Sequence, residues 1–238
     1  MEKQRLIAAL VVALGLVALT VGGCGTTSST PGLVQLFPDP TDPASSPFPA
    51  IDDAYLEVPF TSGFAFPFYG TTYRSVYLNT NGGLTFAAGD DRYDVGVGAS
   101  AVRIVTLPTI AVFWGDMHAG RYSGVTRTDQ MSYQQFPDRF VVHYVQLQDF
   151  DEATWNNTAA VTLYADGDIE IAYGAVLSRD VLVGVFDGTH VADSQEVVQA
   201  TFADYPSYGS GIVLFDYWGG GAVPSGQLDG RTIAFRAP

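Results

Sequence analysis

The densest group of oxygen-bearing side chains in the sequence lies between residues 149 and 157. It comprises Asp149, Asp151 and Glu152, followed by Asn156 and Asn157. Calcium prefers several carboxylate and carbonyl oxygens from one loop, and this segment offers them. It lacks the glycine-containing spacing of a known calcium loop, and acidic loops are commonly only solvated. We therefore expect no cofactor and no metal ligands, and we keep calcium at Asp149, Asp151 and Glu152 as an open alternative.

No catalytic arrangement stands out in the sequence. The three histidines, His118, His143 and His190, are too scattered to indicate a metal cluster, and Ser210 lacks the strand-elbow pattern of a nucleophile. A glycosidase needs two carboxylates facing each other across a cleft, and the sequence does not show which acids converge. We expect no catalytic residues, with an envelope hydrolase as the alternative of a different class.

Aromatic residues gather in glycine-rich segments near the C-terminus. Such rings can stack on the apolar faces of sugars, which predicts a carbohydrate-binding surface as an alternative function. The competing interpretation, which we favour, is that they cover the open end of the fold. The possible ligand-binding residues are Tyr205, Tyr208, Tyr217 and Trp218.

The first 24 residues have the organisation of a secretion signal. Lys3 and Arg5 precede an uncharged apolar stretch, Leu6–Val21, and two glycines then lead to Cys24, the only cysteine. The run Val-Gly-Gly-Cys resembles the lipobox of bacterial lipoproteins. That resemblance implies cleavage before Cys24, a lipid on its thiol, and a place in the bacterial cell envelope, at the outer membrane or the cell surface. Two or three acyl chains would anchor the protein far more firmly than one.

The composition divides the chain into three parts. Residues 1–23 are the expected signal peptide, 24–50 the lipidated cysteine with a Pro/Ser/Thr-rich stalk, and 51–238 the folded domain. The stalk holds six prolines and too little apolar surface to offset the entropy of ordering it, so we expect disorder there. Its apolar patch, Leu33–Phe37, is a candidate for docking onto the domain.

The charge of the exported chain excludes a nucleic-acid partner. Without residues 1–23, nine basic and 24 acidic residues remain, a net charge of −15, and every remaining basic residue is arginine. Such a surface repels phosphate backbones. The partners we expect are a membrane, through the lipid, and an extracellular protein or glycan.

The elements that must position these side chains are β-strands. Short β-branched and aromatic runs alternate with Gly, Asn, Asp and Pro, and no stretch after the signal has convincing helical periodicity. About a dozen short strands predict an all-β protein, an antiparallel β-sandwich. The expected strands are Tyr55–Pro59, Phe64–Phe68, Tyr73–Asn79, Leu84–Phe86, Thr109–Trp114, Gln130–Phe136, Arg139–Gln148, Ala159–Ala165, Asp168–Tyr173, Val181–Phe186, Ile212–Phe215 and Arg231–Arg236.

Two turns and one strand end carry sharper expectations. Asp166-Gly167 predicts a hairpin with a type I′ turn, because both residues accept the positive φ angles it requires. Asn79–Gly83 predicts a second turn. In the strand that ends at Trp114, we expect Ile110, Val112 and Trp114 to point inward, with Asp116 leaving the strand to hold a neighbouring turn.

Several of these segments resemble the extracellular nidogen-type (NIDO) domain. Phe66–Gly70, the strand to Asn79, the Asn81-Gly82 turn and Leu84–Phe86 match its opening pattern, and Ile110–Asp116 matches its Phe-Trp-x-Asp signature. His118 stands where the family often has a second aspartate. The resemblance implies a role in adhesion or extracellular matrix without catalytic machinery.

Overall fold

In the computed structural model, the described residues all belong to the part of the chain that follows residue 31. The described residues are 34–35, 52–61, 63–93, 105–119, 121–122, 125–126, 130–152, 154, 156–178, 181–188, 196–198, 213–218 and 228–238, with backbone alone at 34–35, 121–122, 125–126, 196–198 and 213–218. Among these residues there is no helix long and apolar enough to cross a membrane.

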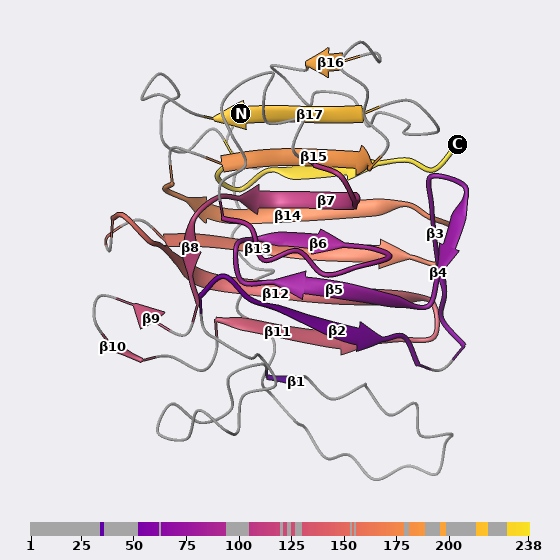
Figure 1. Ribbon diagram of the computed structural model, residues 1–238, viewed down its shortest axis with the longest axis horizontal. Helices are drawn as coiled ribbons and strands as arrows, with labels where there is room; N and C mark the ends of the chain where they lie inside the picture. Colours follow the sequence, from indigo (N-terminus) through magenta and orange to yellow (C-terminus); the bar gives the residue numbers. More distant parts are fainter. Residues whose placement is uncertain are drawn as a thin grey trace, which may run out of the picture. The chain divides into compact units, whose positions relative to one another are not determined.

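Two seven-stranded sheets form the domain, and they pack face to face (Figure 1). All pairings are antiparallel except that of β16 with β17. In the first sheet the order is β1 (Val34–Gln35), β11 (Met131–Gln135), β12 (Arg139–Asp149), β13 (Asn156–Tyr164), β14 (Ile169–Val176) and β18 (Thr232–Phe235), with β8 (Met117–His118) also paired to β12. In the second sheet the order is β16 (Glu196–Val198), β17 (Val213–Trp218), β15 (Val181–Asp187), β7 (Pro108–Trp114), β6 (Gly83–Thr85), β5 (Ser75–Asn79) and β2 (Tyr55–Pro59).

Two hairpins complete the described fold. They are β3 (Phe66–Phe68) with β4 (Thr71–Tyr73), and β9 (Arg121–Tyr122) with β10 (Val125–Thr126). The expected antiparallel β-sandwich is therefore confirmed. The described residues form eighteen strands rather than a dozen. Five short strands of two or three residues (β1, β8, β9, β10 and β16) were not expected, and the segment Tyr73–Asn79 is divided between β4 and β5.

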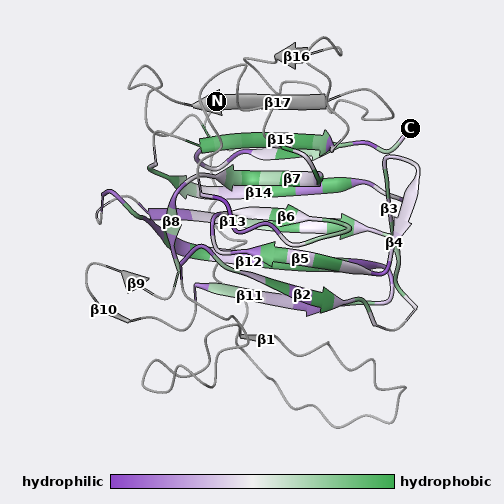
Figure 2. Ribbon diagram, viewed as in Figure 1, coloured by the Kyte–Doolittle hydropathy of each residue, from purple (hydrophilic) through white to green (hydrophobic). Residues whose placement is uncertain are grey.

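Strict alternation of buried and half-buried residues builds the core. In β13 and β14 the predicted apolar positions are buried and their neighbours are half-buried, as a strand with one face on a core requires. Phe64, Phe66 and Phe68, which alternate along one predicted strand, are also buried. Figure 2 shows the resulting apolar colouring along β5, β7 and β15.

Two buried tyrosines join the sheets. The Tyr173 hydroxyl donates to the carbonyl oxygen of Val112 at 2.6 Å, and the Tyr144 hydroxyl donates to that of Gly83 at 3.4 Å. Burial raises the pKa of both phenols well above its ordinary value, so both remain neutral donors. Each bond reaches from the first sheet to the second and fixes how the two layers lie on each other.

The expected inward direction of Trp114 is wrong. The N–H groups of Val112 and Phe113 both point to the carbonyl oxygen of Gly82, at 3.1 and 3.4 Å, and the β7–β15 register shifts here by one residue. This β-bulge places both Val112 and Phe113 in the central core and leaves Trp114 outside it, although still buried. Trp114 instead donates its Nε1–H to the carbonyl oxygen of Arg92 at 3.0 Å, and the Arg92 guanidinium lies 5.8 Å from its ring centroid.

The β13–β14 hairpin forms where predicted, but its turn is not type I′. Gly167 has a φ of +97°, whereas Asp166 does not have a positive φ. The N–H of Gly167 donates to the carbonyl oxygen of Tyr164, and the N–H of Tyr164 donates to that of Asp168. This pattern is typical of a three-residue loop in which a glycine with positive φ follows a turn. The Asn79–Gly83 turn forms as expected, and the Asn79 Oδ1 accepts the Gly83 N–H at 2.7 Å.

The apolar patch before the domain contributes one short strand. Val34 and Gln35 pair with Tyr133 and Ser132 at the edge of the first sheet.

Candidate functional site

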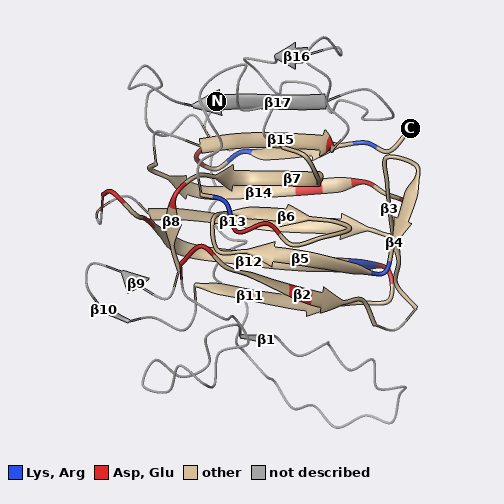
Figure 3. Cartoon of the chain, in the orientation of Figure 1, with Lys and Arg blue, Asp and Glu red and all other residues tan. Residues whose placement is uncertain are grey.

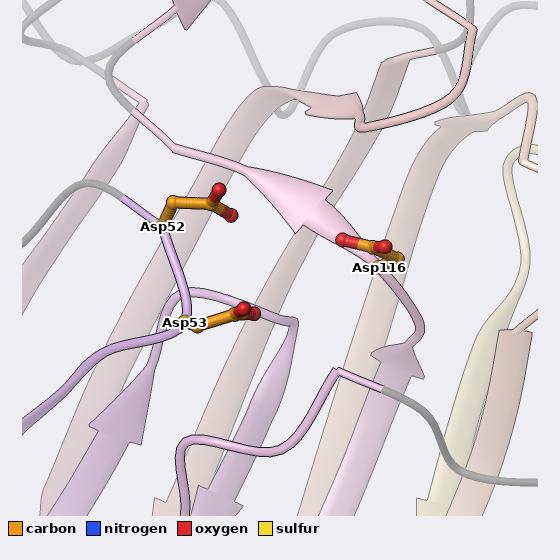
Figure 4. A group of neighbouring side chains, drawn as sticks. All are labelled: Asp52, Asp53 and Asp116. Carbon is orange, nitrogen blue, oxygen red and sulfur yellow. The ribbon is translucent and has the colours of Figure 1, made fainter.

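Three carboxylates converge at one end of the sandwich. Asp52 and Asp53 lie just before β2, and Asp116 lies in the short connection between β7 and β8. One carboxylate oxygen of each lies within 4.8 Å of the others. Figure 4 shows the carboxylates of Asp52 and Asp116 pointing toward each other, with Asp53 beside them. Figure 3 shows several acidic segments at the end of the domain where β8 lies.

Asn81 holds the segments of this site together. Its side chain is fully buried. Its Nδ2 donates to the Asp53 carboxylate at 3.0 Å and to the Arg92 carbonyl oxygen at 3.4 Å, while its Oδ1 accepts the Met117 N–H at 2.9 Å. One amide thus fixes the position of Asp53 relative to the backbone that carries Asp116.

Backbone pairing positions the other two acids. Asp52 forms an isolated antiparallel bridge with His118, and β8 pairs with the end of β12. The N–H of Phe150, just after β12, donates to the carbonyl oxygen of Asp116 at 2.9 Å. The site therefore lies where the segment that leads into β2 of the second sheet contacts β8 of the first sheet.

The electrostatic environment of these acids is unfavourable to their charge. Burial and the nearby carboxylates of Asp53, Asp52, Asp151 and Asp149 raise the pKa of Asp116 to about 6. Burial, and next Asp53, raise the pKa of Asp52, with His118 acting in the opposite direction. Both shifts have the sign expected when carboxylates are desolvated side by side.

Among the described residues, ion pairs and hydrogen bonds do not balance the negative charge of all these carboxylates. No described residue forms an ion pair with Asp52, Asp53 or Asp116. The Oδ1 of Asp52 is buried and accepts no hydrogen bond there. Arg92, whose carbonyl oxygen accepts the bond from Asn81, forms an ion pair with Asp90. Such a group of carboxylates can share a proton or hold a cation.

Three exposed aromatic residues belong to the segments that carry or contact the acidic site. Phe150 is 48% exposed, and its ring stacks on His118 with the centroids 5.8 Å apart. Tyr93, which follows Arg92, is 51% exposed, and Tyr55, two residues after Asp53, is 41% exposed. These rings were not singled out from the sequence.

In the segment with the densest acids, Asp149 holds the loop that follows it. The Asp149 carboxylate accepts the N–H groups of Asp151 and Glu152, at 3.1 and 3.2 Å, and so closes its own loop. Asn157 is buried, and its amide bonds Ser178 and the neighbouring backbone. Asp149 and Asp151 act on the acidic site through their negative charge, which raises the pKa of Asp116.

The other predicted site residues lie beyond what the structure describes. Cys24, Tyr205 and Tyr208 fall outside the described residues, and so do His190 and Ser210. Tyr217 and Trp218 belong to β17, for which the backbone alone is described. His143 lies within β12 as expected, and burial lowers its pKa.

Asp52 and Asp53 were not predicted as site residues from the sequence, and Asn81 was predicted only as part of a turn. Two local signals existed: an Asp-Asp pair directly before the first strand, and the aspartate after Phe-Trp-Gly. Neither reveals that the two places meet, because about 60 residues separate them along the chain.

One family model matches the chain, over residues 39–207, and its description is "NIDO related". This match covers more than half of the chain, and it includes Asp52, Asp53, Asn81 and Asp116. No curated protein and no solved structure matches the chain.

Proposed function

Because the chain belongs to the NIDO-related family, we propose that it is a non-catalytic adhesion module of a bacterial cell surface, tethered by a lipid on Cys24. The family match is the observation that carries this proposal, since nidogen-type domains imply an extracellular role. The acidic, lysine-free exported chain supports a protein or glycan partner outside the cell and argues against nucleic acid.

Binding of the unlipidated chain, residues 25–238, to immobilised extracellular matrix proteins and to a glycan array tests the adhesion role. We expect saturable binding to a protein surface that survives at physiological ionic strength. If no protein surface binds the chain and one class of glycan binds it strongly, the function is carbohydrate recognition rather than adhesion to a protein.

Carbohydrate binding is the second candidate, and a specific observation favours it. Phe150 presents an exposed ring that stacks on His118, the residue bridged to Asp52 of the acidic site. A ring beside hydroxyl-binding oxygens suits a sugar, because the apolar face of the sugar stacks while its hydroxyls donate to the acids. Phe150→Ala should then remove the glycan signal and leave the folded domain intact.

The lipid anchor has its own test. In the full chain, Cys24→Ser removes the thiol that accepts the lipid, so we expect a soluble or uncleaved protein. Partition between detergent and aqueous phases measures this directly. A cleaved Cys24→Ser protein that still enters the detergent phase like wild type would show that the anchor lies elsewhere.

A hydrolase remains the alternative function of a different class, and an Asp116 variant distinguishes a hydrolase from an adhesion module. The module we propose has no turnover, so a broad panel of glycosides and esters should give no hydrolysis with wild type. Hydrolysis by wild type that is lost in a normally melting Asp116→Asn variant would establish an enzyme instead.

A further inference from the structure

We propose that Asp52, Asp53 and Asp116 form a binding site for one calcium ion. This inference rests on the geometry of the acidic site and is independent of the proposed adhesion role. One oxygen from each carboxylate lies within 4.8 Å of the others, from two segments that are distant in sequence. Figure 4 shows how the carboxylates of Asp52 and Asp116 face each other across the space between them.

The independent sign of a missing ligand is the Oδ1 of Asp52. This oxygen is inaccessible to solvent and accepts no hydrogen bond from any described residue. A buried carboxylate oxygen without a donor is costly, and more so when the group is charged. A cation in the adjacent space would satisfy it.

Among the described residues, no arginine forms an ion pair with these three carboxylates, and His118 is the basic side chain that favours the ionised form of Asp52. Arg92 is paired with Asp90, and the remaining ion pairs, Arg139–Asp138 and Arg236–Asp168, involve other acids. The ring of His118 also stacks on Phe150. From the described residues, Asn81 donates a side-chain hydrogen bond to Asp53, which orients that carboxylate.

The donor set selects calcium among the divalent cations. All three side chains offer hard oxygen ligands, which suit calcium and magnesium rather than zinc or copper. Magnesium requires nearly ideal octahedral geometry at short distances, whereas calcium accepts irregular sets of six to eight oxygens, water included. Three carboxylates on two loops, with one side chain exposed, fit the less demanding ion. Asp149 and Asp151 add negative potential without being ligands.

The experiment uses the unlipidated chain, residues 25–238, freed of metal with a chelator. Calcium is titrated by calorimetry, and thermal unfolding is followed with and without calcium. We expect one saturable site with a Kd on the order of 10⁻⁴–10⁻³ M, the range of extracellular calcium modules, and a higher Tm in calcium. Magnesium should bind at least about tenfold more weakly, because its geometry is less tolerant.

Matched variants locate the site. Asp116→Asn and Asp53→Asn should each weaken calcium binding by about tenfold or more and remove the Tm increase, as loss of a charged ligand does. Asp138→Asn removes the same charge from an exposed side chain at the opposite end of β12, and should bind like wild type. Asp53→Asn changes an exposed side chain, so it serves if Asp116→Asn fails to fold.

Three results would overturn the proposal. They are the absence of saturable binding up to about 10 mM calcium, well above the expected range, equal binding by magnesium, and calcium binding that survives in both folded variants. Loss of calcium binding in the variants, with adhesion unchanged, would support the site and show that adhesion does not depend on it.

Discussion

Asn81→Ala is the most informative single change at the acidic site. The substitution leaves the buried N–H of Met117 without its acceptor, at a cost of about 1–3 kcal/mol, and it removes the donor to Asp53, worth roughly 1 kcal/mol. The bond to Arg92 is long, at 3.4 Å, and adds little. We expect the free energy of unfolding to fall by about 3 kcal/mol, which lowers the Tm of a domain of this size by roughly 6–12 °C.

Chemical denaturation of the metal-free chain measures this loss, with an unchanged m-value as the sign that only stability has changed. Asn156→Ala is the matched control, because Asn156 makes a single exposed bond to the Thr154 carbonyl oxygen at 3.4 Å. It should change stability by no more than about 0.5 kcal/mol. A loss below about 1 kcal/mol for Asn81→Ala, or equal losses for the two variants, would refute the role given to Asn81.

Three further changes test other parts of the fold. Gly167→Ala should lower the free energy of unfolding by about 2–3 kcal/mol, because its φ is positive and the new Cβ meets the Pro67 carbonyl oxygen at 3.0 Å. Gly70→Ala, which also has a positive φ but open space around it, should cost only about 1 kcal/mol. Urea unfolding compares the two variants, and equal costs would contradict the role of the contact. Trp114→Ala should cost about 3–5 kcal/mol in the same assay, and a loss under 1 kcal/mol would show that the loop over Trp114 does not depend on it. In chelator, wild type should lose stability relative to Asp116→Asn as the pH rises from about 4 to 7. The pKa of Asp116 in the folded state, about 6, exceeds the ordinary value of 3.8, so the folded state holds a proton that the unfolded state has released until the pH passes the folded pKa. A stability difference that does not change with pH would mean that the pKa of Asp116 is not raised.

The strands could be predicted from the sequence because their signal is local. The alternation Val161, Leu163 and then Ile169, Ile171 needs no partner to be recognised, and the same residues form the core side of β13 and β14. The family resemblance, carried by short motifs within single strands and turns, was equally accessible.

The direction of Trp114 could not be predicted by the same reasoning. A bulge adds one residue to a strand, and every later side chain then points to the opposite face. The bulge at Val112 and Phe113 depends on the carbonyl of Gly82 in the facing segment, which accepts both N–H groups. Periodicity within β7 alone therefore extrapolates to the wrong face.

The acidic site was hidden for a related reason. Asp52 and Asp116 are brought together by the pairing of β8 with β12 and by the bridge from Asp52 to His118, which are contacts of only one or two residues. Such short pairings leave no periodic pattern in a sequence. The acids of residues 149–152 attracted attention because they are adjacent along the chain, although adjacency there serves to close a loop.

The edge position of β1 has a mechanical consequence. Only two residue pairs, Val34 with Tyr133 and Gln35 with Ser132, join β1 to β11. A load on the N-terminal side of the domain meets these pairs before it reaches the bridge at Asp52. This two-residue pairing is the first that such a load would separate, and the longer pairings of β11 with β12 and of β12 with β13 would remain.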